Sequence, residues 1–268
     1  VDELYDNLVR KLDIGDIVGI DGIIFFTKTN ELSIKANDIK LLSKSIRPLP
    51  NMKEKDGKVF FNFDDKEHRY RKRYLDLIIN SENKDIFIKR ANIIHEIRKY
   101  LNSSNYIEVE TPILQPIYGG ANARPFTTFH NTLDQKLFLR IADELYLKRL
   151  IVGGFDKVYE ISKNFRNEGM DKNHNPEFTM LEFYCAYSDI YHMMDLTESM
   201  IKDIAKKINY SNGVVDFNKE FNRASFFELL DKYSSEKISN MSETEIHKIL
   251  KKENVDINKN IGYGKMLD

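Results

Sequence analysis

Residues 165 to 184, with the sequence FRNEGMDKNHNPEFTMLEFY, combine charged and aromatic side chains at a density typical of a binding site. The segment carries an arginine, several glutamates and a histidine next to phenylalanines and a tyrosine. A solvated loop has no need of so many aromatic residues, and a core strand does not tolerate so many charged ones. We therefore interpret this segment as part of a site.

The strand pattern predicts which of these side chains share a surface. Residues 157 to 168 and 177 to 187 have the composition of two strands joined by a polar loop, which predicts a long hairpin. Side chains alternate across a strand, so we expect the even-numbered residues of both strands to face the same side. The even-numbered residues that carry chemistry are Arg166, Glu168, Phe178, Glu182 and Tyr184. The odd-numbered residues predicted to form core are Tyr159, Ile161, Phe165 and Leu181.

The even-numbered face has the parts needed to bind a charged, planar ligand. The guanidinium of Arg166 suits a phosphate or a carboxylate. The ring of Phe178 offers a stacking surface for a base, and a glutamate accepts hydrogen bonds from an ammonium or an exocyclic amine. The same residue types are equally typical of a hairpin with a cross-strand Arg–Glu salt bridge on a solvated face. The hairpin alone does not decide between these two interpretations.

Further candidates lie close to the hairpin in sequence, and each has a plain alternative. His174 and Asn175 occupy the polar loop, where a histidine is most often simply solvated. Glu144 begins a short predicted helix, where an acid is commonly exposed. Gly119 and Gly120 are typical of a turn, but they also allow the backbone to approach a ligand closely.

The elements that must position these residues follow from hydrophobic periodicity. We predict helices over 84 to 103, 144 to 152 and 189 to 208, with shorter helical patterns at 224 to 233 and 242 to 252. Residues 106 to 114 read as one strand that ends at Pro112. Helices beside a mostly antiparallel sheet predict an α+β fold for the main domain.

The first 50 residues have a different pattern. Residues 2 to 12 have leucines at helical spacing, and 17 to 26 and 31 to 43 read as strands joined by a turn at Thr29 and Asn30. This order predicts a small unit that is part of a β-barrel. Residues 51 to 68 read as a polar linker.

Composition limits the function classes. The 268 residues carry a formal net charge of −1, so the overall charge gives no indication of a nucleic-acid or membrane partner. The single cysteine, Cys185, excludes a disulfide framework and favours a reducing compartment. No apolar run approaches the length of about 18 residues that spans a bilayer. We expect a cytoplasmic protein with no membrane partner; an organellar location stays open because the chain begins at Val1 rather than Met.

The residues of the hairpin resemble a known family. FRNEG followed by HNPEFTMLEFY resembles motif 2 of class II aminoacyl-tRNA synthetases, and NYIEVETP resembles motif 1, whose terminal proline is Pro112. RYRKRYLDLI is similar to the entry to the catalytic domain in the lysine, aspartate and asparagine subgroup. Within that subgroup, GGANARPF, LFLRIADELYLKRLIVGGFDKVYEI, HNPEFT and EFY resemble the lysyl-tRNA synthetases. The similarity runs from about residue 66 to residue 190, and GDIVGIDG with ELSI resembles the end of the family's OB barrel.

The resemblance implies a domain organisation. It implies a partial OB-fold anticodon-binding domain over 1–50, a linker over 51–68, and a class II catalytic domain over 69–268. That catalytic domain is expected to have a six-stranded antiparallel sheet flanked by helices and to be truncated before motif 3. A homodimer through the motif 1 region, with Pro112 as its marker, is also implied.

The resemblance also implies a two-step reaction. Lysine attacks the α-phosphate of ATP to give lysyl-adenylate and pyrophosphate, and the lysyl group then moves to the 3′ end of tRNA(Lys). Mg²⁺ is the implied companion of ATP, with its acidic ligands expected beyond residue 268. The residues implied to bind ATP are Arg166, Asn167, Glu168, His174, Asn175 and Phe178, with Arg166 catalytic. The residues implied to bind lysine are Gly120, Glu144, Arg166, Glu182 and Tyr184.

Three alternatives are weighed against this function. The first is an aspartyl- or asparaginyl-type synthetase, against which Glu144 and Glu182 argue, because a substrate with two ammonium groups needs more than one buried carboxylate. The second is a lysine ligase acting on a protein side chain, and the third is a non-catalytic paralogue that senses lysine or binds RNA. Which glutamate takes which ammonium stays open. Asn105 replaces a glycine usual in motif 1, and asparagine tolerates left-handed geometry.

Overall fold

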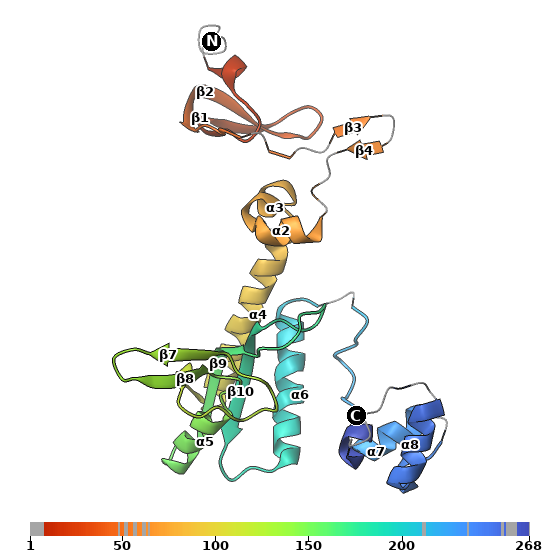
Figure 1. Cartoon of the computed structure of the whole chain (residues 1–268). Helices are drawn as coiled ribbons and strands as arrows, with labels where there is room; N and C mark the ends of the chain where they lie inside the picture. The colour runs from red at the N-terminus through yellow and green to blue at the C-terminus, as the bar shows by residue number, and fades with distance from the viewer. Residues whose placement is uncertain are drawn as a thin grey trace. The chain divides into compact units, whose positions relative to one another are not determined.

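The structure of the chain is a computed structural model (Figure 1). It describes residues 8–47, 49–50, 53–55, 58–60, 63, 65–210, 213–234, 236–252, 255 and 262–267. The chain divides into two compact units, Val1–Lys99 and Tyr100–Asp268. The domain boundaries expected from the sequence are not tested by this division and stay a prediction.

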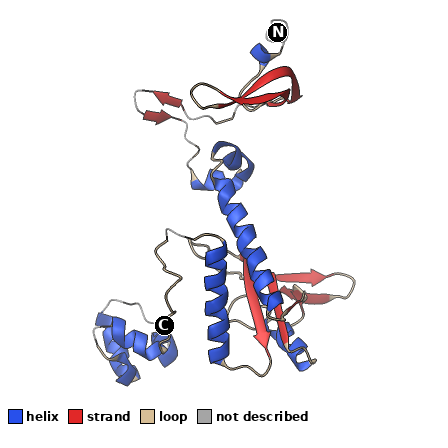
Figure 2. Ribbon diagram, turned by 180° about the vertical axis from the view of Figure 1, so that it is seen from behind, coloured by secondary structure: helices blue, strands red, loops and turns tan. Residues whose placement is uncertain are grey.

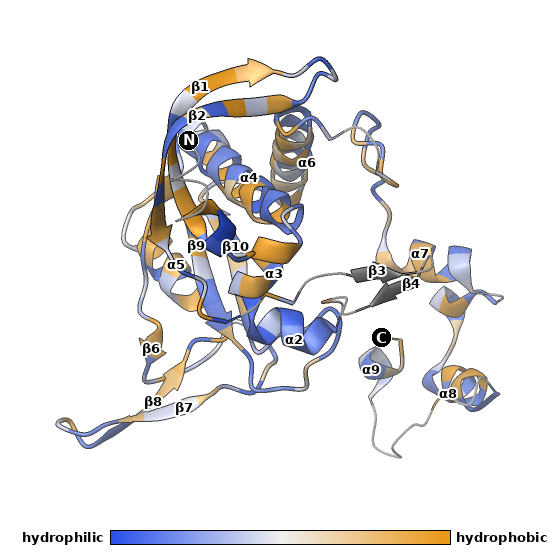
Figure 3. Cartoon of the chain, turned by 90° about the horizontal axis from the view of Figure 1, so that it is seen from above, coloured by the Kyte–Doolittle hydropathy of each residue, from blue (hydrophilic) through white to orange (hydrophobic). Residues whose placement is uncertain are grey.

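The first unit begins with a long antiparallel hairpin. A 3₁₀ turn, η1 (Val9–Lys11), precedes β1 (Ile17–Phe26) and β2 (Leu32–Ser43). Both strands were expected from the sequence and are confirmed, as is the turn between them, where Asn30 has a φ of 62°. Most of the predicted helix over 2 to 12 lies outside the described residues. Figure 3 shows hydrophobic stretches along both strands.

A carboxylate organises the helices that end the first unit. Strands β3 (Lys53–Lys55) and β4 (Lys58–Phe60) form a short hairpin before α2 (Lys66–Arg71), α3 (Arg73–Ile79) and α4 (Asn83–Ser103). Asp76 is fully buried and accepts hydrogen bonds from side chains in all three helices and the turn before α4. Its donors are Arg69, Arg73, Asn80 and Asn83.

The second unit is built on the predicted hairpin. Strand β9 (Lys157–Phe165) pairs antiparallel with β10 (Glu177–Cys185), the two long strands of this unit in Figure 2. The short β5 (Ile107–Glu108) pairs parallel with β9, which gives the order β10-β9-β5. Before β5, Asn105 has a φ of 62°, the left-handed geometry expected of it. The pairing of β9 with β10 confirms the predicted hairpin, although both strands end earlier than predicted, at Phe165 and Cys185.

The prediction of a single strand over residues 106 to 114 is wrong. The segment pairs with β9 only at β5 and then crosses to a second sheet, whose order is β6 (Leu114–Gln115), β8 (Gln135–Leu139) and β7 (Thr127–His130). The crossing has a polar cause. The guanidinium of Arg140 binds the carbonyl and hydroxyl oxygens of Thr111, and the Arg140 N–H donates to the Ile113 carbonyl at 2.9 Å.

Helices complete the second unit. α5 (Glu144–Val152) contacts both β9 and β10, and α6 (Ile190–Lys207) starts after Asp189, whose carboxylate caps the helix by accepting from the His192 N–H. The remaining elements are α7 (Phe226–Tyr233), η2 (Ile238–Asn240), α8 (Glu243–Lys252) and α9 (Tyr263–Leu267). The five helices predicted over 84 to 103, 144 to 152, 189 to 208, 224 to 233 and 242 to 252 are confirmed, and so is the α+β class.

The core of the second unit is small and centred on β9. Its most buried apolar side chains are Leu101, Ile141, Leu147, Val158 and Tyr159. Of the predicted odd-numbered core residues, Tyr159 is fully buried, whereas Ile161, Phe165 and Leu181 are half-buried. The described residues of the second unit form two separate three-stranded sheets rather than the six-stranded sheet that the resemblance implied. In the described part of the chain, no helix is both long and apolar enough to cross a membrane.

Candidate active site

The register of β9 and β10 brings the even-numbered residues together as expected. Phe178 lies opposite Asn164, and Glu182 lies opposite Glu160. Directly opposed residues in an antiparallel pair project from the same face. The surface predicted from alternation therefore exists, with Phe178, Glu182 and Tyr184 along β10.

Arg166 lies at the end of β9, at the point where the chain leaves the sheet. Its backbone N–H donates to the Pro176 carbonyl at 2.8 Å, which extends the hairpin by one residue. Its guanidinium carbon is 5.0 Å from the centre of the Phe178 ring, a cation–π contact. Its Nε is buried and has no hydrogen-bond partner among the described residues. A buried donor left without an acceptor is costly, so this atom is available to an anionic ligand.

Glu182 is held from two sides. The Tyr184 hydroxyl donates to its Oε2 at 3.0 Å, and the backbone N–H of Asp143 donates to its Oε1 at 3.3 Å. Burial raises the pKa of Glu182, and the neighbouring carboxylates of Asp143 and Glu144 raise it further. Burial likewise raises the pKa of the Tyr184 hydroxyl, which therefore acts as a hydrogen-bond donor to the glutamate. The pair forms a fixed acceptor surface for a cation.

Gly120 and Glu144 meet at the start of α5. Gly120 has a φ of 86°, and a Cβ built on it would lie 2.8 Å from the Cβ of Glu144. Only glycine satisfies both the backbone angle and this close approach. The Glu144 carboxylate is bonded to the ammonium of Lys148 at 2.6 Å, and that ammonium is 5.9 Å from the centre of the Tyr184 ring. A lysine side chain of the protein itself thus already contacts two of the predicted lysine-binding residues.

The residues predicted in the loop have their described contacts within or next to the loop. His174 Nδ1 is 2.8 Å from Asp171 Oδ2, and the Asn175 amide donates to the Glu177 carbonyl at 2.8 Å. The backbone of Asn167 and the carboxylate of Glu168 both contact the backbone of Arg124, at 2.7 and 3.2 Å. These side chains are exposed, and their described hydrogen bonds do not involve the Arg166 guanidinium. The structure brings together the residues on the sheet and α5, but not those of the loop.

Pro112, the predicted marker of a dimer interface, is exposed and lies between β5 and β6. Its carbonyl accepts a hydrogen bond from the Gln115 side chain at 3.0 Å, which fixes the start of β6. No partner chain is present to test its role, so that role stays a prediction.

Sequence reasoning missed Arg140 and Asp143, which form a buried polar cluster with Glu160 and Ser162 on this face. Arg140 is 3% exposed, and its Nη1 bonds to Glu160 Oε1 at 2.7 Å while its Nε lies 3.3 Å from Asp143 Oδ1. Asp143 is fully buried and accepts from the Ser162 hydroxyl, and burial raises the pKa of its carboxyl group. A signal was present in the sequence, because Arg140 and Asp143 bracket the apolar pair Ile141 and Ala142.

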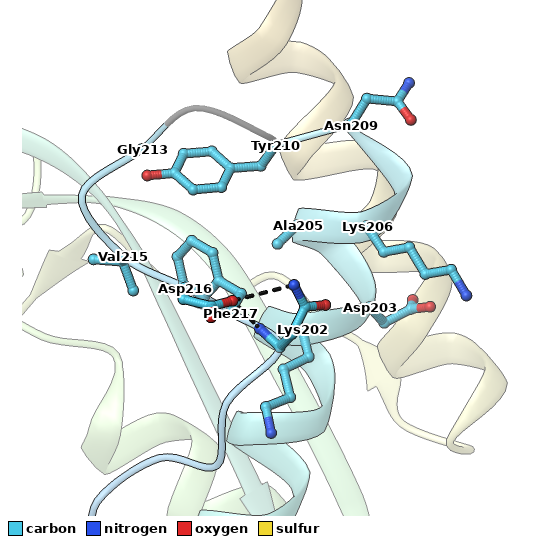
Figure 4. Close-up of a pocket in the computed structure, with 11 residues that line it drawn as sticks. Lys202, Asp203, Ala205, Lys206, Asn209, Tyr210, Gly213, Val215, Asp216 and Phe217 are labelled. Atoms are coloured by element: carbon cyan, nitrogen blue, oxygen red, sulfur yellow. Dashed lines mark hydrogen bonds between the residues drawn. The ribbon is translucent and has the colours of Figure 1, made fainter.

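A cavity on the surface of the described residues lies elsewhere. It has a volume of about 820 Å³ and is lined by the end of α6 and the segment that follows, including Lys202, Lys206, Tyr210 and Phe217 (Figure 4). None of the residues predicted to bind ATP or lysine lines it. We base the site on the hairpin, because the buried unpaired donor and the clustered carboxylates are there.

Within the described ranges, no group of three or more His, Cys, Asp or Glu residues is arranged to hold a metal ion.

Comparison with known proteins agrees with the residues that carry the resemblance. Two curated proteins from Porphyromonas gingivalis, strains ATCC 33277 and W83, are named lysine–tRNA ligase and are each 49% identical to this chain over 273 residues. A protein of the same name from Azobacteroides pseudotrichonymphae is 46% identical over 273 residues. Each match covers 99% of this chain, but only 47%, 47% and 55% of the three relatives. The chain thus spans about half the length of the curated relatives it matches.

A family model gives the assignment directly. The model described as tRNA synthetases class II (D, K and N) matches residues 65–258, which is well over half of the chain and includes α5, β9 and β10. The chain belongs to the family of class II tRNA synthetases of the D, K and N group.

Proposed function

We propose that the protein carrying this chain is a lysine–tRNA ligase, which activates lysine with ATP and transfers it to the 3′ end of tRNA(Lys). The curated relatives of that name support the proposal, as does the chemistry of the face formed by β9, β10 and α5. The observation that carries it is Arg166, whose buried Nε has no hydrogen-bond partner among the described residues and whose guanidinium stacks on Phe178.

Arg166 has the central role in the activation step. Its guanidinium binds both the α-phosphate of ATP and the carboxylate of lysine, which brings nucleophile and phosphorus together. As the carboxylate oxygen attacks, negative charge grows on the phosphate oxygens, and the fixed guanidinium stabilises it. Pyrophosphate leaves, and lysyl-adenylate remains. The ring of Phe178, already held under Arg166, stacks on the adenine.

The acids on this face select lysine over other amino acids. Glu144 and Glu182 each accept from one of the two ammonium groups, with the Tyr184 hydroxyl fixing Glu182 and Gly120 leaving room beside Glu144. An aspartate substrate would bring a second carboxylate to these acids, which repel it. Lys148 currently occupies Glu144, so its ammonium moves away when the ligand arrives.

The remaining assignments belong to the same proposal. Glu168 accepts from the adenine amino group, and Asn167, His174 and Asn175 hold the nucleotide once the loop turns inward. Pro112 lies in the interface of a homodimer, and Mg²⁺ accompanies ATP. The single cysteine and the family support a cytoplasmic location.

The test is ATP–pyrophosphate exchange by the protein expressed from the full open reading frame, with lysine, aspartate and asparagine as substrates. We expect exchange with lysine alone. The variant Arg166→Ala removes the charge that stabilises the transition state, so its exchange rate falls by a factor on the order of 100 or more. Arg149→Ala is the matched control, because Arg149 is an exposed arginine on α5 that stacks on Tyr146.

Each result has a definite meaning. Exchange that depends on aspartate or asparagine moves the protein to that branch of the group. Absence of exchange with every amino acid, from folded protein, overturns the enzyme proposal in favour of a non-catalytic paralogue that senses lysine or binds RNA. Equal loss in Arg166→Ala and Arg149→Ala contradicts the role given to Arg166.

A further inference from the structure

The start of α5 is anchored by a buried acid that has no assigned role. Asp143 precedes Glu144, and its carbonyl accepts the first hydrogen bond of the helix, from the Leu147 N–H at 3.2 Å. Its side chain does not cap the helix. Instead, the carboxylate points into the sheet, where the Ser162 hydroxyl donates to Oδ2 and Arg140 Nε lies 3.3 Å from Oδ1.

The backbone of the same residue holds a predicted lysine-binding group. The Asp143 N–H donates to Glu182 Oε1 at 3.3 Å. Asp143 is therefore hydrogen-bonded to three elements. Its carboxylate bonds to Ser162 on β9, its N–H bonds to Glu182 on β10, and its carbonyl accepts the first hydrogen bond of α5, the helix that carries Glu144. Because a fully buried side chain has little freedom, the position of its peptide N–H is set by the contacts of its carboxylate.

The charges around Asp143 are unbalanced. Four carboxylates, those of Asp143, Glu144, Glu160 and Glu182, face two cationic side chains, Arg140 and Lys148. Arg140 forms ion pairs with both Asp143 and Glu160, and Lys148 forms an ion pair with Glu144. Asp143 Oδ1 makes no hydrogen bond in the described part of the chain. Excess negative charge of this kind is relieved by a cationic ligand.

We propose that Asp143 is a positioning residue for lysine: its carboxylate, held by Ser162 and Arg140, fixes the peptide that orients Glu182 and begins the helix that carries Glu144. It does not touch the ligand. It also adds to the negative field that favours a dicationic amino acid over a neutral or acidic one. This inference rests on the proposed function, because it names what sets lysine affinity at that same site.

The experiment measures lysine- and ATP-dependent exchange kinetics and thermal unfolding for a set of variants in the full open reading frame. In Asp143→Ala the anchor is lost, so the KM for lysine rises about tenfold while the KM for ATP and kcat stay within about twofold. In Asp143→Asn the Ser162 hydroxyl keeps an acceptor, so the KM for lysine rises only about threefold. Glu177→Ala, an exposed acid on the same hairpin that pairs with Lys163, is the matched control and changes none of these values.

Ser162→Ala covers the case in which Asp143→Ala does not fold. It removes the donor to Asp143 Oδ2 while leaving every carboxylate in place, and the KM for lysine rises about as much as in Asp143→Asn. The proposal is overturned if Asp143→Asn and Ser162→Ala are folded and their KM for lysine stays within about twofold of that of the unsubstituted protein. It is also overturned if the KM values for lysine and ATP, kcat and thermal stability all decline together, which is the signature of a purely structural residue. Lysine-dependent exchange by the unsubstituted protein separates this failure from a failure of the proposed function, which overturns both.

Discussion

Two long antiparallel hairpins in this chain differ in which side chains they expose and which they bury. The β1–β2 hairpin pairs strands of 10 and 12 residues and leaves large apolar side chains exposed on both faces, including Ile23 at 67% and Ile24 at 67%. The β9–β10 hairpin pairs two strands of 9 residues and buries polar side chains together with apolar ones, with Glu160 at 3% and Asn164 at 0% exposed. Hydrophobic pattern alone therefore does not decide which strands are buried.

The difference lies in what covers each hairpin. Over β9 and β10, Arg140 and the start of α5 supply hydrogen bonds and a charge to the buried acids, so their desolvation is compensated. Among the described residues, β1 and β2 pair only with one another. A hairpin becomes a site when neighbouring elements complement its polar face, and a hairpin without such neighbours contributes little stability.

We expect the largest effect on the difference between the hairpins from removing the charge of Arg140, which lies at the centre of the buried polar cluster on β9. In Arg140→Leu, Glu160 loses its ion pair and Asp143 loses its nearest cation, and both stay buried. We expect the second unit to lose about 3–5 kcal/mol of unfolding free energy, the usual effect of breaking a buried ion pair from one side. Denaturant unfolding followed by circular dichroism measures it.

Lys163→Ala is the control for that experiment. Lys163 lies on β9 too, but its pair with Glu177 is exposed, so the loss should be at most about 1 kcal/mol. Equal losses of unfolding free energy in the two variants would show that the buried ion pairs of Arg140 contribute no more stability than an exposed pair on the same strand.

The next largest effect comes from two glycine substitutions, which distinguish a steric clash of the new Cβ with Glu144 from backbone strain at positive φ. Gly120→Ala and Gly154→Ala both place a side chain at positive φ, and strain there costs about 1–3 kcal/mol. Only at Gly120 does the new Cβ meet Glu144, at 2.8 Å, whereas nothing lies within 4 Å at Gly154. We expect both variants to lose stability, but only Gly120→Ala to raise the KM for lysine. A similar rise in Gly154→Ala would contradict the proposed position of Gly120 in the site.

Acid should affect the two hairpins in opposite directions. At the base of β1–β2, hydrogen bonds from Lys44 and from the N–H groups of Asp13 and Ser45 hold the pKa of Asp16 at about 2. The stability that Asp16 contributes is present above its unfolded pKa of about 3.9 and is lost as the pH falls toward 2. Burial raises the pKa values of Asp143 and Glu182, so their contribution is full below about pH 4 and is lost as the pH rises through their folded pKa values.

Hydrogen exchange detected by mass spectrometry checks this, with rates corrected for the intrinsic exchange at each pH. Between pH 4 and 2, protection should decrease in β1 and β2 and hold in β9 and β10. Above pH 4, β9 and β10 should be the strands that lose protection. A common response of both hairpins would refute the assignment of these shifts to separate local environments.

The smallest effect concerns the exposed apolar face. Ile23→Ala removes a side chain that is 67% exposed, so unfolding free energy should change by no more than about 0.5 kcal/mol. Val158→Ala, at a fully buried position of β9, is the comparison and should lose at least about 1 kcal/mol. Thermal unfolding of both variants gives the answer. A larger loss from Ile23→Ala would mean that β1 is covered in solution.

Local pattern predicted the elements well because each has a strong local signal. The helices at α4, α5 and α6 have apolar residues at helical spacing, and alternation on β9 and β10 identified the face that carries Phe178 and Glu182. The turn at Asn30 and the left-handed Asn105 follow from what asparagine tolerates. These features depend on residues a few positions apart.

Features that depend on distant partners were not predicted. The segment after β5 leaves the sheet because Arg140, about thirty residues later, binds Thr111, and no local pattern encodes that contact. The β7–β8 hairpin was missed, because its strands have only four and five residues and show no clear alternation of apolar and polar side chains. Asp143 looked like an ordinary residue before a helix, and only the fold reveals that its carboxylate points inward.

The carboxylate of Asp76 has a consequence for how the chain survives proteases. The stretch before and around it is rich in tryptic sites, at Lys66, Arg69, Arg71, Lys72 and Arg73. A protease needs several residues of extended backbone to cut, and two of these arginines are held by Asp76 together with Asn80 and Asn83. One buried anion thus protects the most cleavable stretch of the sequence, and the segment resists digestion for as long as that anion keeps its donors.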